Sequence, residues 1–264
     1  MHTRIQYHLY LLLSMPFLLN AQYKSTGFLA RDGYSMYGLK AGATLSGISN
    51  LQTTILSEPY FLNYTLNAQK RYGWTAGIFY NYRFQNPFIS IETDLGYAQE
   101  GSDIVFNNLE KDFNYRMQFK YQYINLAGIL KFYPWGDRFD NEMATERNGT
   151  AGFYVGAGPQ AGFNVAAQNI VYASGGKGRL VAFGSDLDQQ QQLRNVLKGK
   201  TNFGFSFGLG YEFSALKLSV DAKYFLGLTD VTATQSNQYN FIENKNTSSY
   251  FMLVLGWDFS SFVK

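Results

Sequence analysis

Apolar and polar residues alternate with a period of two in eight segments of the chain. In the clearest segment, 202–213, every odd-numbered residue is Phe, Leu or Tyr, and every even-numbered residue is Asn, Gly, Ser or Glu. Successive side chains of a strand point to opposite faces, so this pattern predicts a strand with one apolar face and one small or polar face. A tilted strand of about ten residues is long enough to cross a membrane.

The same alternation predicts seven further strands. They lie at 37–45, 74–84, 89–97, 117–132, 153–163, 217–226 and 251–259. The segment 117–132 changes phase, because Met117 and Phe119 occupy odd positions whereas Leu126 and Leu130 occupy even ones. One extra residue reverses the face on which the later side chains lie, so we expect a bulge near 124–125.

The links between the predicted strands alternate in length. Short links are expected at 85–87 and around 214–215, and long polar links are expected at 46–70, 99–114, 166–200 and 230–249. Outer-membrane barrels have short periplasmic turns and long external loops. The link at 134–150 departs from this rule, since it is longer than a tight turn. The pattern predicts an all-β fold, an eight-stranded antiparallel transmembrane up-and-down β-barrel.

The two faces of these strands distinguish a membrane barrel from a soluble one. One face carries rows of Phe, Tyr and Leu without a charge, and the other carries small residues with isolated charges. In lipid, only helices and closed barrels pair every backbone group. Aromatic residues also gather near the strand ends, as in an interfacial girdle. The predicted membrane-interface aromatics are Trp74, Tyr82, Phe84, Tyr97, Tyr211, Phe213, Trp257 and Phe259.

The polar face contains charges of both signs. The predicted lumen charge cluster consists of Lys40, Arg83, Glu92, Asp94, Lys120, Glu212, Asp221, Lys223 and Asp258. A barrel of about eight strands has room for side chains inside but hardly for a channel. A buried charge also needs a partner. We therefore interpret the cluster as a structural plug of ion pairs, with a polar conduit as the alternative.

The first residues predict a secretory signal peptide. Arg4 supplies a basic start, 9–19 is apolar, and Leu19-Asn20-Ala21 provides a small-residue cleavage site. The apolar run of about eleven residues is too short for a transmembrane helix, which needs about 20. We therefore expect residues 1–21 to be removed and 22–264 to form a single barrel domain in the outer membrane of a Gram-negative bacterium.

Composition excludes several kinds of chemistry. His2 and His8 both lie in the predicted signal peptide, and the chain has no Cys. The exported chain would therefore lack a Ser-His pair and any metal site built from His or Cys. A net charge of +3 is also far from the basic footprint of a nucleic-acid-binding protein. We predict no nucleic acid, no cofactor, no metal and no catalysis, although Glu92 and Asp94 keep a His-free barrel enzyme as an alternative.

Two other motifs are interpreted as structural. The segment 156–161, Gly-Ala-Gly-Pro-Gln-Ala, loosely matches a dinucleotide fingerprint. That fingerprint requires a helix directly after the strand, whereas the alternation here continues through it. Residues 175–179 and 189–192 resemble phosphate-binding or low-complexity segments, and we interpret them as parts of a solvated loop.

Four segments carry a resemblance to a known family. They are Tyr37–Ser46, Tyr121–Tyr133, the Gly-rich Phe153–Phe163 and the closing Phe251–Phe259. In these segments, and in the Asn-Ala-Gln junction at 20–22, the chain resembles the PorT-like outer-membrane β-barrel proteins of Bacteroidota. The match covers nearly all of 22–264 through loose strand patterns, and 260–264 extends past the terminal aromatic on which such barrels often end. The resemblance implies an outer-membrane barrel and, through one member associated with type IX secretion, support of a secretion or envelope complex.

The sequence thus favours a structural or partner-binding barrel. Its expected surroundings are outer-membrane lipid, and its expected partners are another envelope protein or a surface glycan. These partners would bind through the external loops at 46–70, 166–200 and 230–249. A small passive pore or transporter is the alternative from a different class.

Overall fold

The computed structural model describes most of the chain after residue 33. The described ranges are 34–57, 62–84, 88–108, 112–134, 152–166, 170–175, 185–213, 216–234 and 245–259. The predicted signal peptide, the short link at 85–87 and nearly all of the link at 134–150 lie outside these residues.

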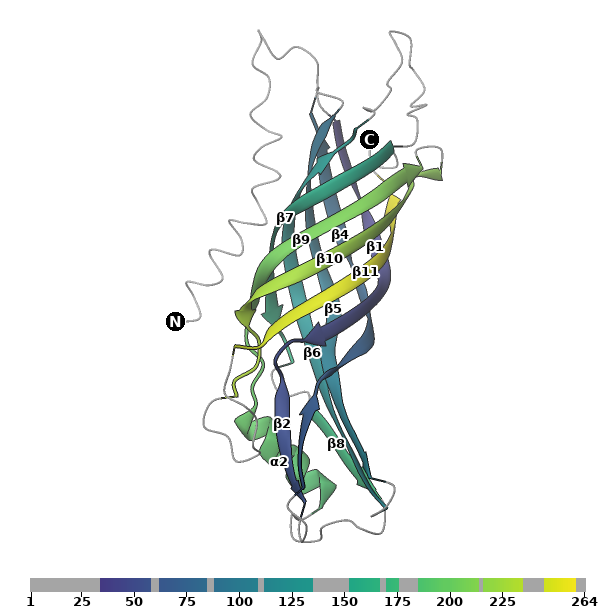
Figure 1. The fold of residues 1–264 in the computed structure, drawn as a ribbon. Helices are drawn as coiled ribbons and strands as arrows, with labels where there is room; N and C mark the ends of the chain where they lie inside the picture. Colours follow the sequence, from purple (N-terminus) through teal and green to yellow (C-terminus); the bar gives the residue numbers. More distant parts are fainter. Residues whose placement is uncertain are drawn as a thin grey trace, which may run out of the picture. The chain divides into compact units, whose positions relative to one another are not determined.

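Eight antiparallel strands form a closed ring (Figure 1). In the order of their pairing they are β5 (Ile89–Asn108), β4 (Gln69–Arg83), β1 (Tyr34–Ile48), β11 (Thr247–Asp258), β10 (Leu218–Asp230), β9 (Asn202–Phe213), β7 (Gly152–Asn164) and β6 (Phe113–Phe132). The pairing of β5 with β6 closes the ring. The predicted eight-stranded antiparallel barrel is confirmed, and each ring strand overlaps one of the eight predicted segments.

Each ring strand separates an apolar outer row from a small or polar inner row. On β9 the odd-numbered residues point outward, where Phe203 and Leu209 are about half exposed, and Ser206 between them is buried. The glycines of 156–161 lie within β7, so no helix follows them as a dinucleotide site would require. The alternation that predicted the strands therefore reflects an outside and an inside.

The bulge expected near 124–125 is absent from β6. The pairing of β6 with β5 keeps one register along the whole strand, from Phe113 to Phe132. Odd-numbered residues point inward throughout, so Met117 and Phe119 are buried inside while Leu130 is exposed outside. The prediction was wrong because the inside of the barrel changes from polar to apolar along β6, while the phase of the strand stays constant.

The long links are structured, contrary to the expectation of loops. Residues 46–70 contain the hairpin β2 (Gln52–Ser57) and β3 (Leu62–Asn67), and most of 99–114 continues β5 and β6. Residues 166–200 contain β8 (Ile170–Gly175), which pairs with β6, and the helix α2 (Asp186–Val196). The glutamines at 189–192 therefore belong to a helix. We call these parts together the extension: β2, β3, 99–108 of β5, 113–122 of β6, β8 and α2.

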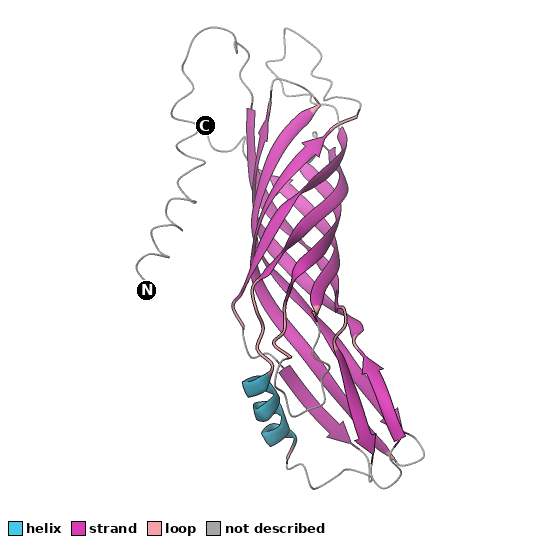
Figure 2. Ribbon diagram, turned by 60° about the vertical axis from the view of Figure 1, so that its left-hand side comes forward, coloured by secondary structure: helices cyan, strands magenta, loops and turns pink. Residues whose placement is uncertain are grey.

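The extension projects from the end of the barrel at which β1 finishes (Figures 1 and 2). Figure 2 shows long strands leaving the ring at this end, with α2 beside them. In the part of the chain that the structure describes, no helix combines the length and the apolar character needed to cross a membrane.

An apolar core fills the extension and the adjoining mouth of the barrel. It consists of Ile48, Leu51, Ile104, Phe106, Tyr115, Met117, Phe119, Tyr121, Tyr123, Ile170, Leu193, Leu197 and Val231, all of them buried. These residues come from β1, β5, β6, β8, α2 and the segments next to them. The burial of apolar side chains is the main favourable contribution to folding. The core of the extension therefore stabilises this part of the molecule in addition to the strand pairing of the ring.

Helix α2 covers the free edge of β8 with its side chains. Asp186 accepts hydrogen bonds from the Ser174 amide (3.0 Å) and hydroxyl (2.6 Å), and Gln190 accepts one from the Tyr172 amide (3.2 Å). Arg194 Nε donates to the carbonyl of Ile170 (2.9 Å). Four helical residues rise about 6 Å and two strand residues span about 6.7 Å, so every fourth helix residue meets every second strand residue.

Candidate functional site

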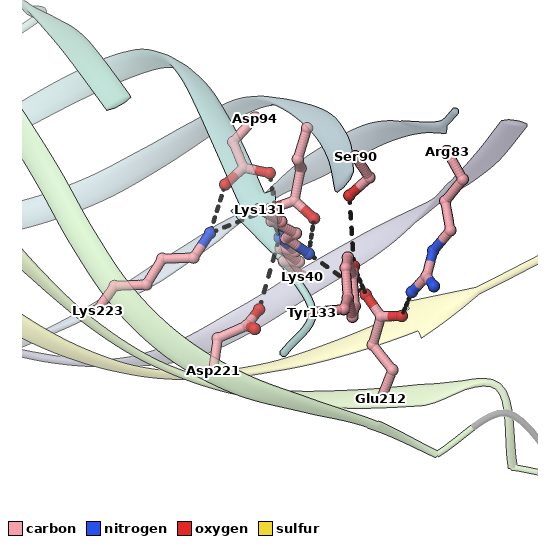
Figure 3. Close-up of polar contacts among 10 residues, drawn as sticks. Lys40, Arg83, Ser90, Asp94, Lys131, Tyr133, Glu212, Asp221 and Lys223 are labelled. Carbon is pink, nitrogen blue, oxygen red and sulfur yellow. Dashed lines mark hydrogen bonds and ion pairs between the residues drawn. The ribbon is translucent and has the colours of Figure 1, made fainter. Parts of the chain in front are cut away.

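Eight charged side chains meet inside the barrel (Figure 3). Four are cations and four are carboxylates, from six different strands: Lys40, Arg83, Lys131, Lys223, Glu92, Asp94, Glu212 and Asp221. We call this set the lumen plug. Equal numbers of opposite charges, together with closed strands around them, satisfy the requirement that buried charges be paired.

Glu92 on β5 lies at the centre of the lumen plug. Its carboxylate forms ion pairs with Lys40 from β1, Lys131 from β6 and Lys223 from β10; the last of these has an N–O distance of 3.2 Å. Glu92 is 1% exposed. Three ammonium groups around one buried carboxylate leave neither of its oxygens open to a substrate.

Glu212 on β9 forms a second centre. Arg83 of β4 donates to its Oε2, and the Tyr133 hydroxyl donates to its Oε1 at 3.0 Å. Lys131 also reaches Oε1 at 3.4 Å, so this lysine joins the two centres. Arg83 and Lys131 each lie 4.0 Å from the centroid of a tyrosine ring, and such cation–π contacts offset part of the cost of burying the cations.

Asp94 and Asp221 complete the lumen plug. Asp94 pairs with Lys223 at 2.6 Å and with Lys40 at 3.1 Å. Asp221 is fully buried, and its Oδ2 lies 3.5 Å from the Lys40 ammonium. The backbone of Gly210 on the neighbouring strand leaves space for it, since a Cβ at Gly210 would come within 2.5 Å of Asp221 Oδ1.

The structure brings together seven of the nine predicted lumen residues. Lys120 is not among them, because it lies on the outward-facing row of β6, on the outer surface of the extension. Asp258 lies on the inward row of β11 but at the last residue of the strand, away from the ion pairs of the plug. Lys131 takes part and was missed, although it stands between the outward Leu130 and Phe132, which already implied an inward side chain.

A polar layer follows the lumen plug toward the extension. Tyr250 accepts hydrogen bonds from Gln160 and from Asn125 (3.2 Å). The buried Glu100 accepts one from the Ser248 hydroxyl (2.9 Å). A cavity of about 60 Å³ between this layer and the plug has room for about two water molecules. Beyond it lies the apolar core of the extension, so successive layers of side chains occupy the lumen.

The surroundings of Glu92 and Asp94 are relevant to the alternative of a His-free barrel enzyme, in which these two carboxylates would act. Both Glu92 and Asp94 are held by lysine ammonium groups. A general base has to lie within hydrogen-bond reach of a substrate proton. Within the described ranges, no three His, Cys, Asp or Glu side chains are grouped as metal ligands. The arrangement is suited to holding strands together.

The outward row of the ring forms an apolar belt. On β9 it runs from Phe203 to Phe213, ten residue steps that span about 26 Å along the barrel axis at a tilt of about 40°, close to the apolar band of membrane barrels. The eight predicted interface aromatics are all at least partly exposed. Trp74 and Tyr97 pack together with ring centroids 4.8 Å apart, and so do Tyr211 and Phe213.

The predicted partner loops overlap the extension. Residues 46–70 and 166–200 contribute β2, β3, β8 and α2 to it. Residues 230–249 are described only in part, and Thr232 from this segment shares a hydrogen bond with Tyr121 of the apolar core (2.7 Å). The extension is therefore a structured surface on which a partner could bind.

Comparison with the curated proteins found no significant match. Among solved structures, the chain is similar to Ail, the attachment invasion locus protein of Yersinia pestis, solved with the heparin analogue sucrose octasulfate. That match has 14% identity and a TM-score of 0.34, and covers 87% of this chain and 100% of Ail. Neisserial surface protein A matches with 11% identity and a TM-score of 0.35, covering 84% of this chain and 97% of the other. Such low TM-scores support no conclusion about this chain.

A family model supplies the identification. The model described as "Outer membrane protein beta-barrel domain" matches residues 20–233. The matched range includes seven of the eight ring strands and ends before β11. It agrees with the closed ring and with the apolar belt around it. The chain therefore belongs to the family of outer membrane protein beta-barrel domains.

Proposed function

We propose that the chain is a non-enzymatic outer-membrane barrel that binds a partner outside the cell through its extension. The apolar core of the extension is the observation that carries the proposal. For a barrel that served only to cross the membrane, short links at both ends would be enough. This barrel instead continues its strands beyond the ring and adds β8 and α2 to them. Structured surfaces of this kind carry binding functions in many proteins.

The second part of the proposal is that the barrel does not conduct, and the contents of the lumen support it. Eight paired charges, a polar layer and an apolar core follow one another from the middle of the barrel to the extension. Removing one partner from such a buried network leaves an uncompensated charge, so the network resists opening. Binding at the extension therefore explains the architecture better than transport through the lumen does.

The orientation follows the asymmetry of outer-membrane barrels, which place long connections outside and short turns in the periplasm. By this rule the extension lies at the cell surface, where it meets surface polymers and other envelope proteins. Export by cleavage after residue 21 and a role in a type IX-like secretion or envelope complex belong to the same proposal, through the resemblance to PorT-like proteins.

Site-specific photo-crosslinking in native outer membranes tests the proposal. Leu187 on α2 is 75% exposed, so a photoreactive residue there should capture a specific partner. The same residue at Leu216, 64% exposed and at the opposite end of the ring, is the matched control. The proposal predicts adducts from 187 that are absent from 216. Identical adduct patterns at the two sites would contradict it.

A further inference from the structure

The outer wall of the molecule, where β4 of the ring meets the extension, carries cations that the lumen plug and the apolar core do not use. Asp103 of β5 accepts from Arg71 of β4 (3.0 Å) and from Arg116 Nε of β6 (3.1 Å), with Gln118 Nε2 at 3.3 Å. Lys70 precedes Arg71 on β4, and Lys120 lies two residues after Gln118 on β6. We call Lys70, Arg71, Asp103, Arg116 and Lys120 the wall patch; four cations and one carboxylate give it a net charge of about +3.

The register places the two lysines on either side of β5. Lys120 pairs with Gly101, and Lys70 pairs with Ser102, the next residue of the same strand. Their Cα atoms are therefore separated by about two strand spacings, roughly 10 Å. Lys70 continues the outward row of Tyr72 and Trp74 on β4, and Lys120 lies on the outward row of β6, so both lysines are on the outer surface. Neither ammonium has an ion pair among the described residues, and Arg116 keeps one guanidinium nitrogen unused, with its side chain 55% exposed.

A local irregularity brings Arg71 to this surface. Gly101 has φ +148°, and a Cβ there would lie 1.7 Å from the carbonyl of Phe119, so only glycine fits. Ser46 fills the shift in pairing between β4 and β5 by bonding the amide of Gly101 (2.9 Å) and its carbonyl (3.1 Å). The distortion lets two arginines from strands on opposite sides of β5 meet at Asp103.

The wall patch lies just beyond the apolar belt. Tyr97, whose ring packs on Trp74, precedes Gly101 by four residues of β5, about 10 Å along the barrel axis at a tilt of about 40°. Aromatic rings of this kind mark the boundary between hydrocarbon and headgroups. The patch therefore faces the headgroup layer of the outer leaflet, in the orientation of the proposed function.

We infer that the wall patch binds the phosphates of the acylated glucosamine lipid in the outer leaflet of the membrane. Two ammonium groups without an ion pair among the described residues, together with an arginine nitrogen that has no partner there, match a phosphate in charge and in hydrogen bonding. Partial desolvation at the headgroup layer strengthens such contacts. The inference rests on the orientation in the proposed function, but it does not require a protein partner.

Native mass spectrometry of the full chain in detergent, titrated with diphosphoryl lipid A, tests this inference. Dephosphorylated lipid A serves as the second probe. Wild type should retain the phosphorylated form more strongly. Lys120→Gln should weaken that binding roughly fivefold, and Lys70→Gln with Lys120→Gln roughly 25-fold, as expected for cations at a charged lipid surface. Lys198→Gln, which removes an exposed lysine next to α2, is the control and should leave the binding unchanged.

Two results would overturn the inference: equal retention of the two lipids by wild type, or an equal loss in Lys198→Gln and Lys120→Gln. Heat-modifiable migration on gels of unboiled protein shows that each variant is folded before it is titrated. Failure of lipid binding together with successful crosslinking from residue 187 would contradict the lipid site alone. The reverse outcome would contradict the protein partner alone.

Discussion

At the scale of single residues, Glu92 is held by ion pairs from several strands. Three lysines from three strands surround it, and it is buried. Glu92→Gln should therefore lower the free energy of unfolding by about 3–5 kcal/mol, the usual cost of breaking a buried ion pair. Urea titration of the protein folded in lipid vesicles measures this quantity. Thr93→Val, at the next and outward-facing position of β5, is the control and should change it by less than about 1 kcal/mol.

Lys131 provides a second test of the same network. If Lys131 and Glu92 act together, Lys131→Met in the Glu92→Gln background should cost clearly less than it does in wild type, because the partner charge has already gone. Additive effects in this double-mutant cycle would show that the two groups are independent, contrary to the contacts described.

Asp103 should make the stability of the folded protein depend on pH. Partial burial by itself would raise the pKa of Asp103, but the hydrogen bonds from Arg116 and Gln118 and the charge of Arg71 outweigh it and lower the pKa. A carboxyl group with a lowered pKa stabilises the folded state above its unfolded pKa, near 3.8, and this contribution disappears as the pH falls through the folded pKa.

Asp103→Asn should therefore be less stable than wild type by about 1 kcal/mol at pH 7, a modest value because Arg116 is largely solvated. The difference should shrink as the pH falls below the unfolded pKa and disappear once the pH lies below the folded pKa of Asp103. Thermal unfolding of both proteins across this range measures it. A gap that persists unchanged at low pH would show that Asp103 acts through its shape and not through its charge.

At the scale of elements, α2 protects the edge of β8 through residues 186, 190 and 194. Unprotected strand edges pair with other chains, so side chains that satisfy the edge also prevent aggregation. Gln190→Ala should speed hydrogen exchange at the Tyr172 amide about fivefold, as expected from loss of one hydrogen bond. Gln191→Ala, on the exposed side of the same helix, should leave that amide unchanged. Equal exchange rates in the two variants would exclude the role assigned to Gln190.

The depth of β9 in the membrane can be tested with one substitution at two positions. Phe207 lies in the middle of the apolar belt and Phe203 near its edge. Phe207→Arg should destabilise the folded barrel by about 2–4 kcal/mol and Phe203→Arg by about 1 kcal/mol or less, since the cost of a lipid-facing cation depends on depth. Urea titration in vesicles checks both values. Equal costs at the two positions would argue that β9 does not cross the bilayer as described.

The ring strands could be predicted because the lipid on one face and the lumen on the other each favour particular residue types. Lipid selects apolar residues at every second position, and a narrow lumen selects small or paired polar ones between them. On β6 this rule reaches its limit. Beyond the belt the inside is an apolar core, so Tyr121 and Tyr123 point inward although their residue type is that of the lipid face.

The contents of the extension could not be predicted from the same signal. The helix α2 is polar on most of its surface and buries only Leu193 among its described side chains, so it shows little helical periodicity. Strand β8 is six residues long and acquires its neighbours only when the extension forms. A cue for the helix was nonetheless present, since Ser185 and Asp188 form a capping box.

At the scale of the whole molecule, the barrel combines a sealed lumen with a structured external end. The ion pairs of the lumen plug connect strands on opposite sides of the ring, from β4 and β5 to β9 and β10. Such links make the middle of the barrel stiff, and the extension builds on the strands that leave this rigid ring. A binding surface held on rigid strands loses less conformational freedom when a partner binds.

Single-channel recording in planar bilayers tests the central claim most directly. Purified wild-type protein, shown to be folded by its heat-modifiable migration, should give no stable conductance, because paired charges and apolar side chains occupy the lumen in successive layers. Reproducible open channels from the wild-type protein would contradict the account and would identify the barrel as a pore.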